Sequence, residues 1–288
     1  MQPRFEQFIR ERQCLHNVTP STVEWYKHSL KWLPSESPSQ QDLRDAVIRM
    51  SESGRKATGC NCALRAINAY LHWSHVGAEV KCGPACKHPK IAQLKEPDLV
   101  LPTFTAQQIR QLVTWKPKGT GKYKRRLRLL ILFLLDTGCR ISEALGLRVR
   151  DLDMENLLVT LDGKGRKQRV VPFSFELRKA MCRYIAEGKK TLDSLLFSNR
   201  THTMLAHRNV LRNVKSLCKQ LGFNPPARTL HAFRHTFAVH YLRKGGSVFH
   251  LQKVLGHATL EMTRRYANLM TEDLQAVHEQ VSLLSYTR

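Results

Sequence analysis

A break in helical periodicity near residue 90 constrains the fold of this chain more than any other feature. Glycine and proline interrupt the pattern between residues 81 and 103, at Gly83, Pro84, Pro89, Pro97 and Pro102. Boundaries between domains fall in stretches of this kind, and 288 residues suffice for two ordinary domains. We therefore predict a helical domain over residues 1–92, a linker over 93–102 and a second domain over 103–288.

The first domain is predicted to be entirely helical. Apolar residues recur at helical spacing in four series: Phe5, Phe8 and Ile9; Val23, Tyr26, Leu30 and Leu33; Leu43, Val47, Ile48 and Met50; and, within 63–73, Leu64, Ile67, Tyr70 and Leu71. Ser21 stands three residues before Glu24, which is the spacing of a capping box at the start of the second series.

The second domain is predicted to be mainly helical with a small antiparallel sheet, an α+β arrangement in a mostly α chain. Thr105 and Gln108 have the spacing of a capping box at its start. Two strand patterns, 157–161 and 169–172, flank a turn rich in glycine and lysine, which predicts a β-hairpin. Helical spacing marks residues 127–135, 176–187, 207–221 and 271–284.

The balance of charge predicts a polyanionic partner. The chain has 47 Lys and Arg residues against 23 Asp and Glu, a formal net charge of +24. A folded protein this basic is expected to bind nucleic acid, and a basic linker between two basic domains suits a clamp around a duplex. A membrane surface is the other candidate partner, but no lipidation motif supports it. With no signal-peptide core and no apolar run of roughly 18–20 residues, we expect a soluble cytoplasmic protein.

The eight cysteines are expected to be reduced thiols in such a compartment. Cys60 and Cys62 lie in a predicted helical segment, where residues two apart point in different directions. The loop-like pair Cys82 and Cys86, with His88 nearby, suits zinc better, and the sequence leaves that possibility open. Unpaired small hydrophobic residues are the favoured interpretation. No metal or other cofactor is predicted.

The stretch from residue 230 to 266 carries most of the candidate chemistry. It contains His231, Arg234, His235, His257 and Tyr266. Arginine presents a planar fork of donors that fits a phosphate, and histidine moves protons near neutral pH. Tyrosine acts as a nucleophile where its neighbours stabilise the phenolate. Each residue alone is equally well explained as a cap or a packing residue, but the set suits attack of a tyrosine on a phosphodiester.

Two segments of the second domain complete this set. Gly138 permits a tight turn that presents Arg140, and Glu143 lies one helical turn further on, where it can orient the guanidinium. A plain ion pair at a helix start is the alternative for these two residues. Lys164 sits between two glycines at the predicted hairpin tip, from which it can act as a general acid.

Four motifs of the second domain resemble those of the tyrosine recombinase (phage integrase-like) family. They are T-G-C-R-I-S-E, G-K-G-R-K-Q-R-V-V-P, H-A-F-R-H-T-F-A and L-G-H-A…R-R-Y, in that order. The spacings are also typical, with 24 residues from Arg140 to Lys164, 26 from His231 to His257 and 9 from His257 to Tyr266. In the first domain N-V-T-P-S-T-V-E-W-Y resembles the entry of the family's SAM-like core-binding domain, so the resemblance covers nearly the full length.

The resemblance implies the tyrosine recombinase fold and a role for each residue of the site. Tyr266 would attack the scissile phosphate to form a 3′-phosphotyrosyl link, without metal or ATP. Arg140 and Arg234 would hold the nonbridging oxygens, and Lys164 would protonate the leaving 5′ oxygen. The implied catalytic set is Arg140, Lys164, His231, Arg234, His257 and Tyr266, with Glu143 and His235 in support.

The resemblance also implies partners. These are a double-stranded DNA recombination site, a homotetramer in which residues 271–284 dock on a neighbouring copy, and a possible accessory factor. Candidate DNA contacts are Arg55, Lys56, Arg65, Arg166, Lys167, Arg208 and Arg212. The implied function is integration or excision of a mobile element, or resolution of DNA multimers. A type IB topoisomerase-like enzyme is the alternative with the same chemistry, and a basic DNA-binding protein without activity is the alternative from another class.

Overall fold

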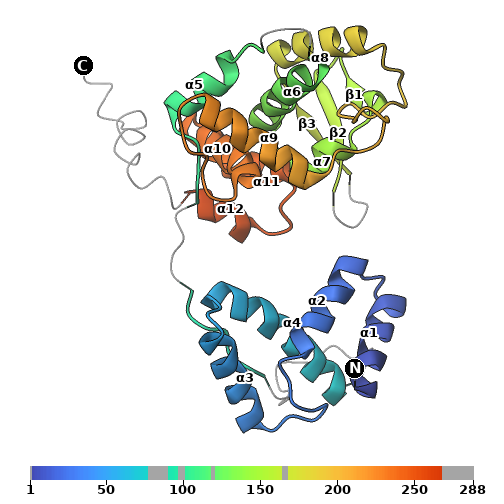
Figure 1. Cartoon of the computed structure of the whole chain (residues 1–288), viewed down its shortest axis with the longest axis vertical. Helices are drawn as coiled ribbons and strands as arrows, with labels where there is room; N and C mark the ends of the chain where they lie inside the picture. Colours follow the sequence, from blue (N-terminus) through green and yellow to red (C-terminus); the bar gives the residue numbers. More distant parts are fainter. Residues whose placement is uncertain (1, 77–89, 97–100, 118–120, 164–167, 268–288) are drawn as a thin grey trace, which may run out of the picture. The chain divides into compact units, whose positions relative to one another are not determined.

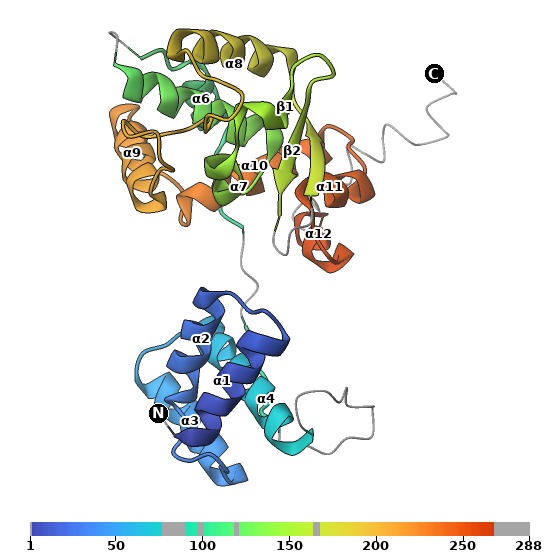
Figure 2. The ribbon, with the colours of Figure 1, turned by 90° about the vertical axis from the view of Figure 1, so that its right-hand side faces the viewer.

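The computed structural model describes residues 2–76, 90–96, 101–117, 121–163 and 168–267. The chain forms two compact units, 1–99 and 100–288, each with its own hydrophobic core (Figures 1 and 2). Within the described ranges, no helix combines the length and the apolar character needed to cross a bilayer.

The first unit is a set of four helices, as the apolar spacing predicts (Figure 1). They are α1 (Pro3–Leu15), α2 (Pro20–Leu30), α3 (Gln40–Glu52) and α4 (Ala57–Val76). Aromatic side chains fill the space between them. Phe8 lies edge-on to Tyr26, with ring centroids 4.9 Å apart, and to Tyr70, with centroids 5.5 Å apart. Aromatic pairs in this geometry stabilise a core beyond the area that they bury.

Two details of the first unit correct the sequence predictions. The capping box at Ser21 is wrong, because α2 begins at Pro20 after Thr19; proline is favoured at the first helical position, where a missing N–H costs nothing. Glu24 instead pairs with Lys27 at 2.9 Å. The apolar series that predicts α3 also differs from its buried face in one member, because Ile48 is 51% exposed while Ala46 is buried.

Residues 90–96 lie against the first unit through two asparagines of α4. Asn68 bonds both the N–H and the carbonyl of Ile91, and Asn61 bonds both backbone groups of Leu94. Each side-chain amide therefore replaces a strand partner for an extended backbone. The packed part of the first unit accordingly reaches at least residue 94.

The second unit places helices around a three-stranded antiparallel sheet (Figure 2). Its helices are α5 (Ala106–Thr114), α6 (Lys122–Thr137), α7 (Ile141–Gly146), α8 (Phe175–Gly188), α9 (His207–Gln220), α10 (Thr229–Arg243), α11 (Val248–Leu255) and α12 (Leu260–Ala267), with a 3-10 turn at Val149–Asp151. The strands are β1 (Leu152–Asp153), β2 (Leu158–Asp162) and β3 (Gln168–Pro172). The capping box of Thr105 and Gln108 is confirmed, and so is the hairpin of β2 and β3. Strand β1 was not predicted, since two residues carry no periodic signal.

Helix α6 is the centre of this unit. Its apolar run is buried because α8 and α10 lie against it, while α11 contacts β3. A smaller apolar cluster joins α10, α11 and α12, and consists of Ala238, Leu242, Leu251, Leu255 and Tyr266. The end of α6, strand β3 and helices α10 to α12 therefore meet in one region of the unit.

Candidate active site

Arg140 is presented by the turn between α6 and α7. Gly138 has φ 60°, in the left-handed region that favours glycine. A Cβ on Gly138 would lie 2.2 Å from Cδ1 of Phe237, so α10 can approach the turn only because this residue has no side chain. Arg140 follows immediately before α7, and its side chain is 38% exposed. The guanidinium is thus anchored at its base and open to a ligand.

Glu143 holds Arg140 through two contacts. One carboxylate oxygen accepts the backbone N–H of Arg140 at 2.7 Å, and the other accepts its Nη1 at 2.9 Å. The Glu143 side chain is only 4% exposed. Burial alone raises the pKa of this carboxyl, but hydrogen bonds from Arg169 and Arg140 outweigh it and hold the pKa below its usual range. The carboxylate is therefore ionised and fixed, as the sequence predicts for an orienting group.

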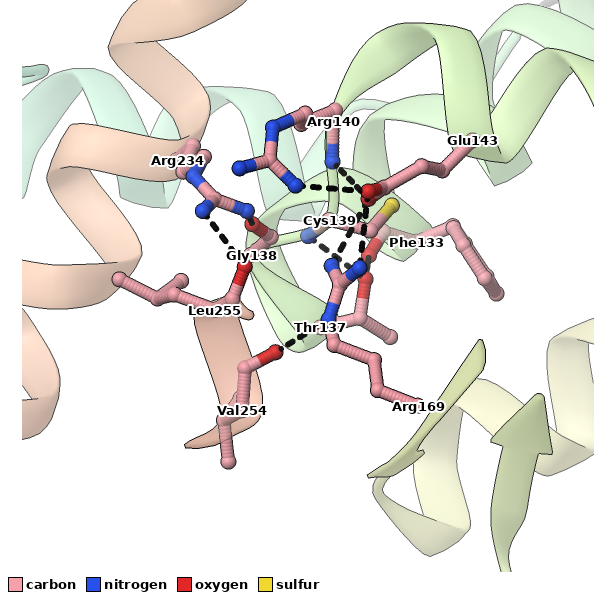
Figure 3. Close-up of polar contacts among 10 residues, drawn as sticks. All are labelled: Phe133, Thr137, Gly138, Cys139, Arg140, Glu143, Arg169, Arg234, Val254 and Leu255. Carbon is pink, nitrogen blue, oxygen red and sulfur yellow. Dashed lines mark hydrogen bonds and ion pairs between the residues drawn. The ribbon is translucent and has the colours of Figure 1, made fainter. Parts of the chain in front are cut away.

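Arg169 of β3 is a member of this network that the sequence reasoning missed (Figure 3). Its two Nη atoms donate to the two oxygens of Glu143, each at 2.8 Å, and its Nε donates to the carbonyl of Val254 at 2.8 Å. A signal was present in the sequence. Alternate residues of a strand share a face, so Arg169 lies on the same side of β3 as the fully buried Val171, and an inward arginine needs a carboxylate partner.

Arg234 comes from the middle of α10 and is 6% exposed. Its Nη1 donates to the carbonyl of Gly138 at 3.1 Å and its Nη2 to that of Leu255 at 2.7 Å. These bonds tie the Arg140 turn to the end of α11, as Figure 3 shows. Burial, and then the charge of Arg140, lower the pKa of Arg234 to about 10, so it stays cationic at neutral pH. Both cations therefore carry their charge in the same site.

Tyr266 of α12 lies between two histidines. Its hydroxyl is 2.9 Å from Nδ1 of His235, and its ring stacks on that of His257 with centroids 6.2 Å apart. Nδ1 of His257 is 2.9 Å from Oγ1 of Thr263, which leaves Nε2 as the ring nitrogen for a ligand. The tyrosine side chain is 4% exposed. The phenol is thus inside the site but turned away from solvent.

Burial, together with the cations of the site, keeps its histidines neutral. Burial, followed by neighbouring positive charge, lowers the pKa of His235 and of His257 to about 4 in each case. The same causes lower the pKa of His231, which is exposed at the start of α10. For His257 and His231 the charges include those of both Arg234 and Arg140. At pH 7 these imidazoles therefore donate or accept protons as neutral groups.

The structure brings together most of the residues that the sequence singles out. Those in the site are Arg140, Glu143, His231, Arg234, His235, His257 and Tyr266. Lys164, Arg166 and Lys167 lie outside the described residues, as do Cys82, Cys86 and the segment 271–284. The other candidate DNA contacts are exposed, three on the first unit (Arg55, Lys56 and Arg65) and two on α9 of the second (Arg208 and Arg212).

The described residues contain no group of three metal-binding side chains. His, Cys, Asp and Glu do not gather in threes anywhere in that part of the chain. Cys60 is buried in the first core, as expected for a small hydrophobic residue, and Cys62 is partly exposed beside it on α4. Burial raises the pKa of Cys139, next to the site, to about 12, so this thiol is not a nucleophile at neutral pH.

A helical unit, a mixed unit and a group of arginines and histidines near a tyrosine are the features expected of a tyrosine recombinase. The family model described as the phage integrase family matches residues 102–273, more than half of the chain. This protein belongs to the phage integrase family. It is a tyrosine recombinase, an enzyme that cuts and rejoins DNA.

Relatives cover nearly the whole chain. Tyrosine recombinase XerA of Pyrococcus horikoshii is 27% identical over 275 residues, which are 94% of this chain and 90% of that protein. Tyrosine recombinase XerD of Yersinia pestis is 28% identical over an alignment 295 residues long with its gaps, which covers 96% of each chain. These matches are to recombinases, so the topoisomerase alternative is not favoured.

Solved structures share the fold. The post-cleavage complex of the XerH site-specific recombinase with a palindromic difH substrate has a TM-score of 0.72 at 20% identity, covering 96% of this chain and 83% of that one. The Tn1549 transposon integrase in complex with transposon right end DNA also has a TM-score of 0.72, at 21% identity, covering 95% of this chain and 100% of that one. The predicted fold class, mostly helical with a small antiparallel sheet, is confirmed.

Proposed function

We propose that Tyr266 is the nucleophile of this recombinase and that the predicted residues act on the scissile phosphate. The observation that carries the proposal is that Arg234 lies within electrostatic reach of both Arg140 and Tyr266, while His257 stacks on the tyrosine, although these residues come from separate segments of the chain. Two fixed guanidiniums can donate hydrogen bonds to the nonbridging oxygens of a phosphodiester. Donors held in place in this way stabilise the negative charge that develops on these oxygens during the reaction.

The proposed reaction exchanges one phosphate ester for another. The phenol oxygen of Tyr266 bonds to phosphorus, its proton passes to a base such as neutral His231, and the bond to the 5′ oxygen breaks. Lys164, as general acid, supplies the proton that the 5′ oxygen takes up. Arg140, Arg234 and Nε2 of His257 hold the phosphate oxygens. The 3′-phosphotyrosyl link stores the bond energy, so a 5′-hydroxyl can reverse the step without ATP or metal.

The position of Tyr266 adds a requirement to this scheme. Its side chain is buried and its hydroxyl contacts His235, so the hydrogen bond has to break before the phenol reaches a phosphate in solvent. One neutral hydrogen bond contributes about 0.5–1.5 kcal/mol, which DNA contacts can readily offset. His235 is thus proposed to hold the tyrosine rather than to touch the substrate.

Trapping a covalent adduct tests the nucleophile. A binding site is first selected from randomised duplexes and then nicked beside the scissile phosphate, so that the cleaved strand diffuses away and the adduct accumulates. The protein should form an adduct that survives denaturing electrophoresis, and Tyr266→Phe should form none. Tyr123→Phe, which changes an exposed tyrosine of α6, should match the unsubstituted protein. An adduct with Tyr266→Phe, or none with the unsubstituted chain, would contradict the proposal.

We also propose that the protein assembles as a tetramer on double-stranded DNA through residues 271–284. A groove of about 1200 Å³ lies among α5, α6, α8 and α10 of the second unit. Its lining includes apolar side chains, among them Val113, Leu132 and Phe237, and cations, among them Arg128, Arg183 and Lys244. The segment has apolar residues at helical spacing (Leu274, Val277, Val281 and Leu284) and acidic residues (Glu272, Asp273 and Glu279). Apolar and charge complementarity therefore support this segment of a neighbouring copy as the occupant.

Two changes test the docking. Deletion of residues 271–288 and Val113→Glu, which places a charge on an exposed apolar side chain of the groove, should each abolish tetramers on DNA while binding to a single half-site persists. Leu192→Glu, at an exposed position outside the groove, is the matched control. Sedimentation of the DNA complexes gives the oligomeric state. Tetramers that persist in both variants would refute the docking.

The remaining expectations are proposals about biological role. Transfer of strands between two sites serves integration or excision of a mobile element, or resolution of DNA multimers, with an accessory factor as a possible partner. The free thiols in the described part of the chain support a reducing compartment such as the cytoplasm. Arg55, Lys56, Arg65, Arg208 and Arg212 are proposed to contact DNA phosphates. The guanidinium of Arg55 lies 4.9 Å from the centroid of the Trp32 ring, which holds it in place for such a contact.

A further inference from the structure

Arg169 links three elements of the second unit through one planar group (Figure 3). It belongs to β3 and forms a bidentate ion pair with Glu143 of α7. Its Nε donates a hydrogen bond to the Val254 carbonyl of α11. The Arg169 side chain is 11% exposed and that of Glu143 is 4% exposed. A guanidinium that donates hydrogen bonds from its Nη atoms and from its Nε fixes the orientation of its partners as well as their distance.

The first consequence concerns charge. Glu143 accepts bonds from Arg140 as well as from Arg169, so the three side chains together carry one net positive charge. Without Arg169, the buried carboxylate and Arg140 would neutralise each other. With Arg169 in place, the charge of Arg140 is available to a phosphate at the exposed end of its side chain.

The second consequence concerns position. The last carbonyls of a helix lack partners within the helix and need donors from elsewhere. At the end of α11, Arg169 bonds the carbonyl of Val254 and Arg234 bonds that of Leu255. Gly256 then turns the chain with φ 65°, and a Cβ there would lie 2.8 Å from Cδ of Arg169. His257 follows directly, so Arg169 helps set where its ring stands.

We propose that Arg169 is a positioning residue of the recombination reaction, which keeps the charge of Arg140 available to the scissile phosphate and fixes the turn before His257. The proposal rests on the proposed roles of Arg140, His257 and Tyr266. Arg169 acts through these residues and does not touch DNA. Groups that orient a functional side chain in this way affect activity by about 10–100-fold.

The test compares two substrates in single-turnover adduct formation. On the natural phosphodiester, Arg169→Gln should slow adduct formation about 100-fold, while DNA binding, measured in the Tyr266→Phe background, changes less than about threefold. On a substrate whose scissile phosphate carries a methyl group in place of one nonbridging oxygen, the linkage has no charge to neutralise. The deficit of the variant should there shrink to about tenfold or less. A merely destabilised protein would be impaired equally on both substrates, and that result would overturn the proposal.

A second substitution supplies an independent check. Glu143→Gln added to Arg169→Gln removes the carboxylate that would otherwise neutralise Arg140, so the double variant should cleave the phosphodiester faster than Arg169→Gln alone. If Arg169→Gln does not fold, the double variant, which buries no unpaired charge, takes its place in the two-substrate comparison. Because the double variant leaves the charge of Arg140 available and loses only the bond to the turn before His257, its remaining deficit should be equal on both substrates. A deficit confined to the phosphodiester would contradict the proposal.

Controls separate this inference from the proposed catalytic site. If the unsubstituted chain forms an adduct, Tyr266→Phe forms none and Arg140→Ala forms it far more slowly, the catalytic assignment holds whatever Arg169 does. Adduct formation by Arg169→Gln at the unsubstituted rate would then refute the role of Arg169 alone. If the unsubstituted chain formed no adduct, the proposed function would be refuted instead.

Discussion

The two units of this protein bury polar groups for different ends. In the first unit, the buried amide of Asn61 is satisfied by the backbone of Leu94 and by Glu96, and apolar and aromatic side chains form the rest of the core. In the second unit, an ion network, two neutral histidines and a tyrosine share one buried region. Burying a charge costs free energy unless partners compensate, and the buried Glu143 and Arg234 both have such partners. The first unit is thus organised for stability, and this part of the second for chemistry.

The largest effect on stability is expected in the first unit. Phe8→Ala removes a fully buried ring that packs on Tyr26 and Tyr70, so the free energy of unfolding should fall by about 3–5 kcal/mol. Denaturant unfolding followed by tryptophan fluorescence measures this change. Leu15→Ala, at an exposed position of α1, should stay within about 0.5 kcal/mol. If Phe8→Ala lowered the free energy of unfolding by less than about 1 kcal/mol, the contrast drawn between the two units would not hold.

Arg140→Ala should have the opposite profile, with a large effect on chemistry and a small one on folding. Loss of a fixed donor to the developing charge slows cleavage about 100–1000-fold. Affinity for the DNA site should change little, because phosphate contacts are spread over many cations. Adduct formation and gel-shift titration measure the two quantities, and Arg150→Ala, an exposed arginine paired with Asp193, serves as control. Equal losses of cleavage and binding would count against the assignment.

Acid should destabilise the second unit through its neutral histidines. The pKa values of His235 and His257 are about 4 in the folded state, against 6.5 in the unfolded chain. Because the unfolded state binds more protons between these values, stability is fully present above pH 6.5 and falls as pH drops toward 4. Melting temperatures across this range should show a smaller slope in His235→Gln/His257→Gln. His250→Gln, on the exposed face of α11, should leave the slope unchanged.

The smallest effect is expected at the exposed cations of the first unit. Arg55→Gln should weaken DNA binding only a few-fold and reduce the slope of log affinity against log salt by about one, because one phosphate contact is lost. Arg44→Gln, an exposed residue of α3, is the matched control. Titration at several salt concentrations distinguishes them, and an unchanged slope for Arg55→Gln would exclude a direct phosphate contact.

Local sequence determined the elements of this fold and most members of its site. The apolar run 127–135 and the Thr105 capping box were predicted because helical period and cap chemistry act within a few residues. Arg140, His257 and Tyr266 were recognised because their motifs and the spacings between them can be read directly from the sequence. The failures were also local. At Ser21 proline outweighed the capping signal, and the apolar series of α3 did not reveal that Ala46 is buried while Ile48 is exposed.

The partners of buried charges were decided only by the tertiary structure. Arg169 lies 26 residues from Glu143 and 85 from Val254, so no periodic pattern connects them. The hydrogen bond between His235 and Tyr266 spans 31 residues and depends on how α12 packs against α10. Local sequence specifies which groups are present and which face they occupy. Whether a tyrosine is exposed or held depends on contacts that form only when distant elements pack, because burial is a property of the packed assembly.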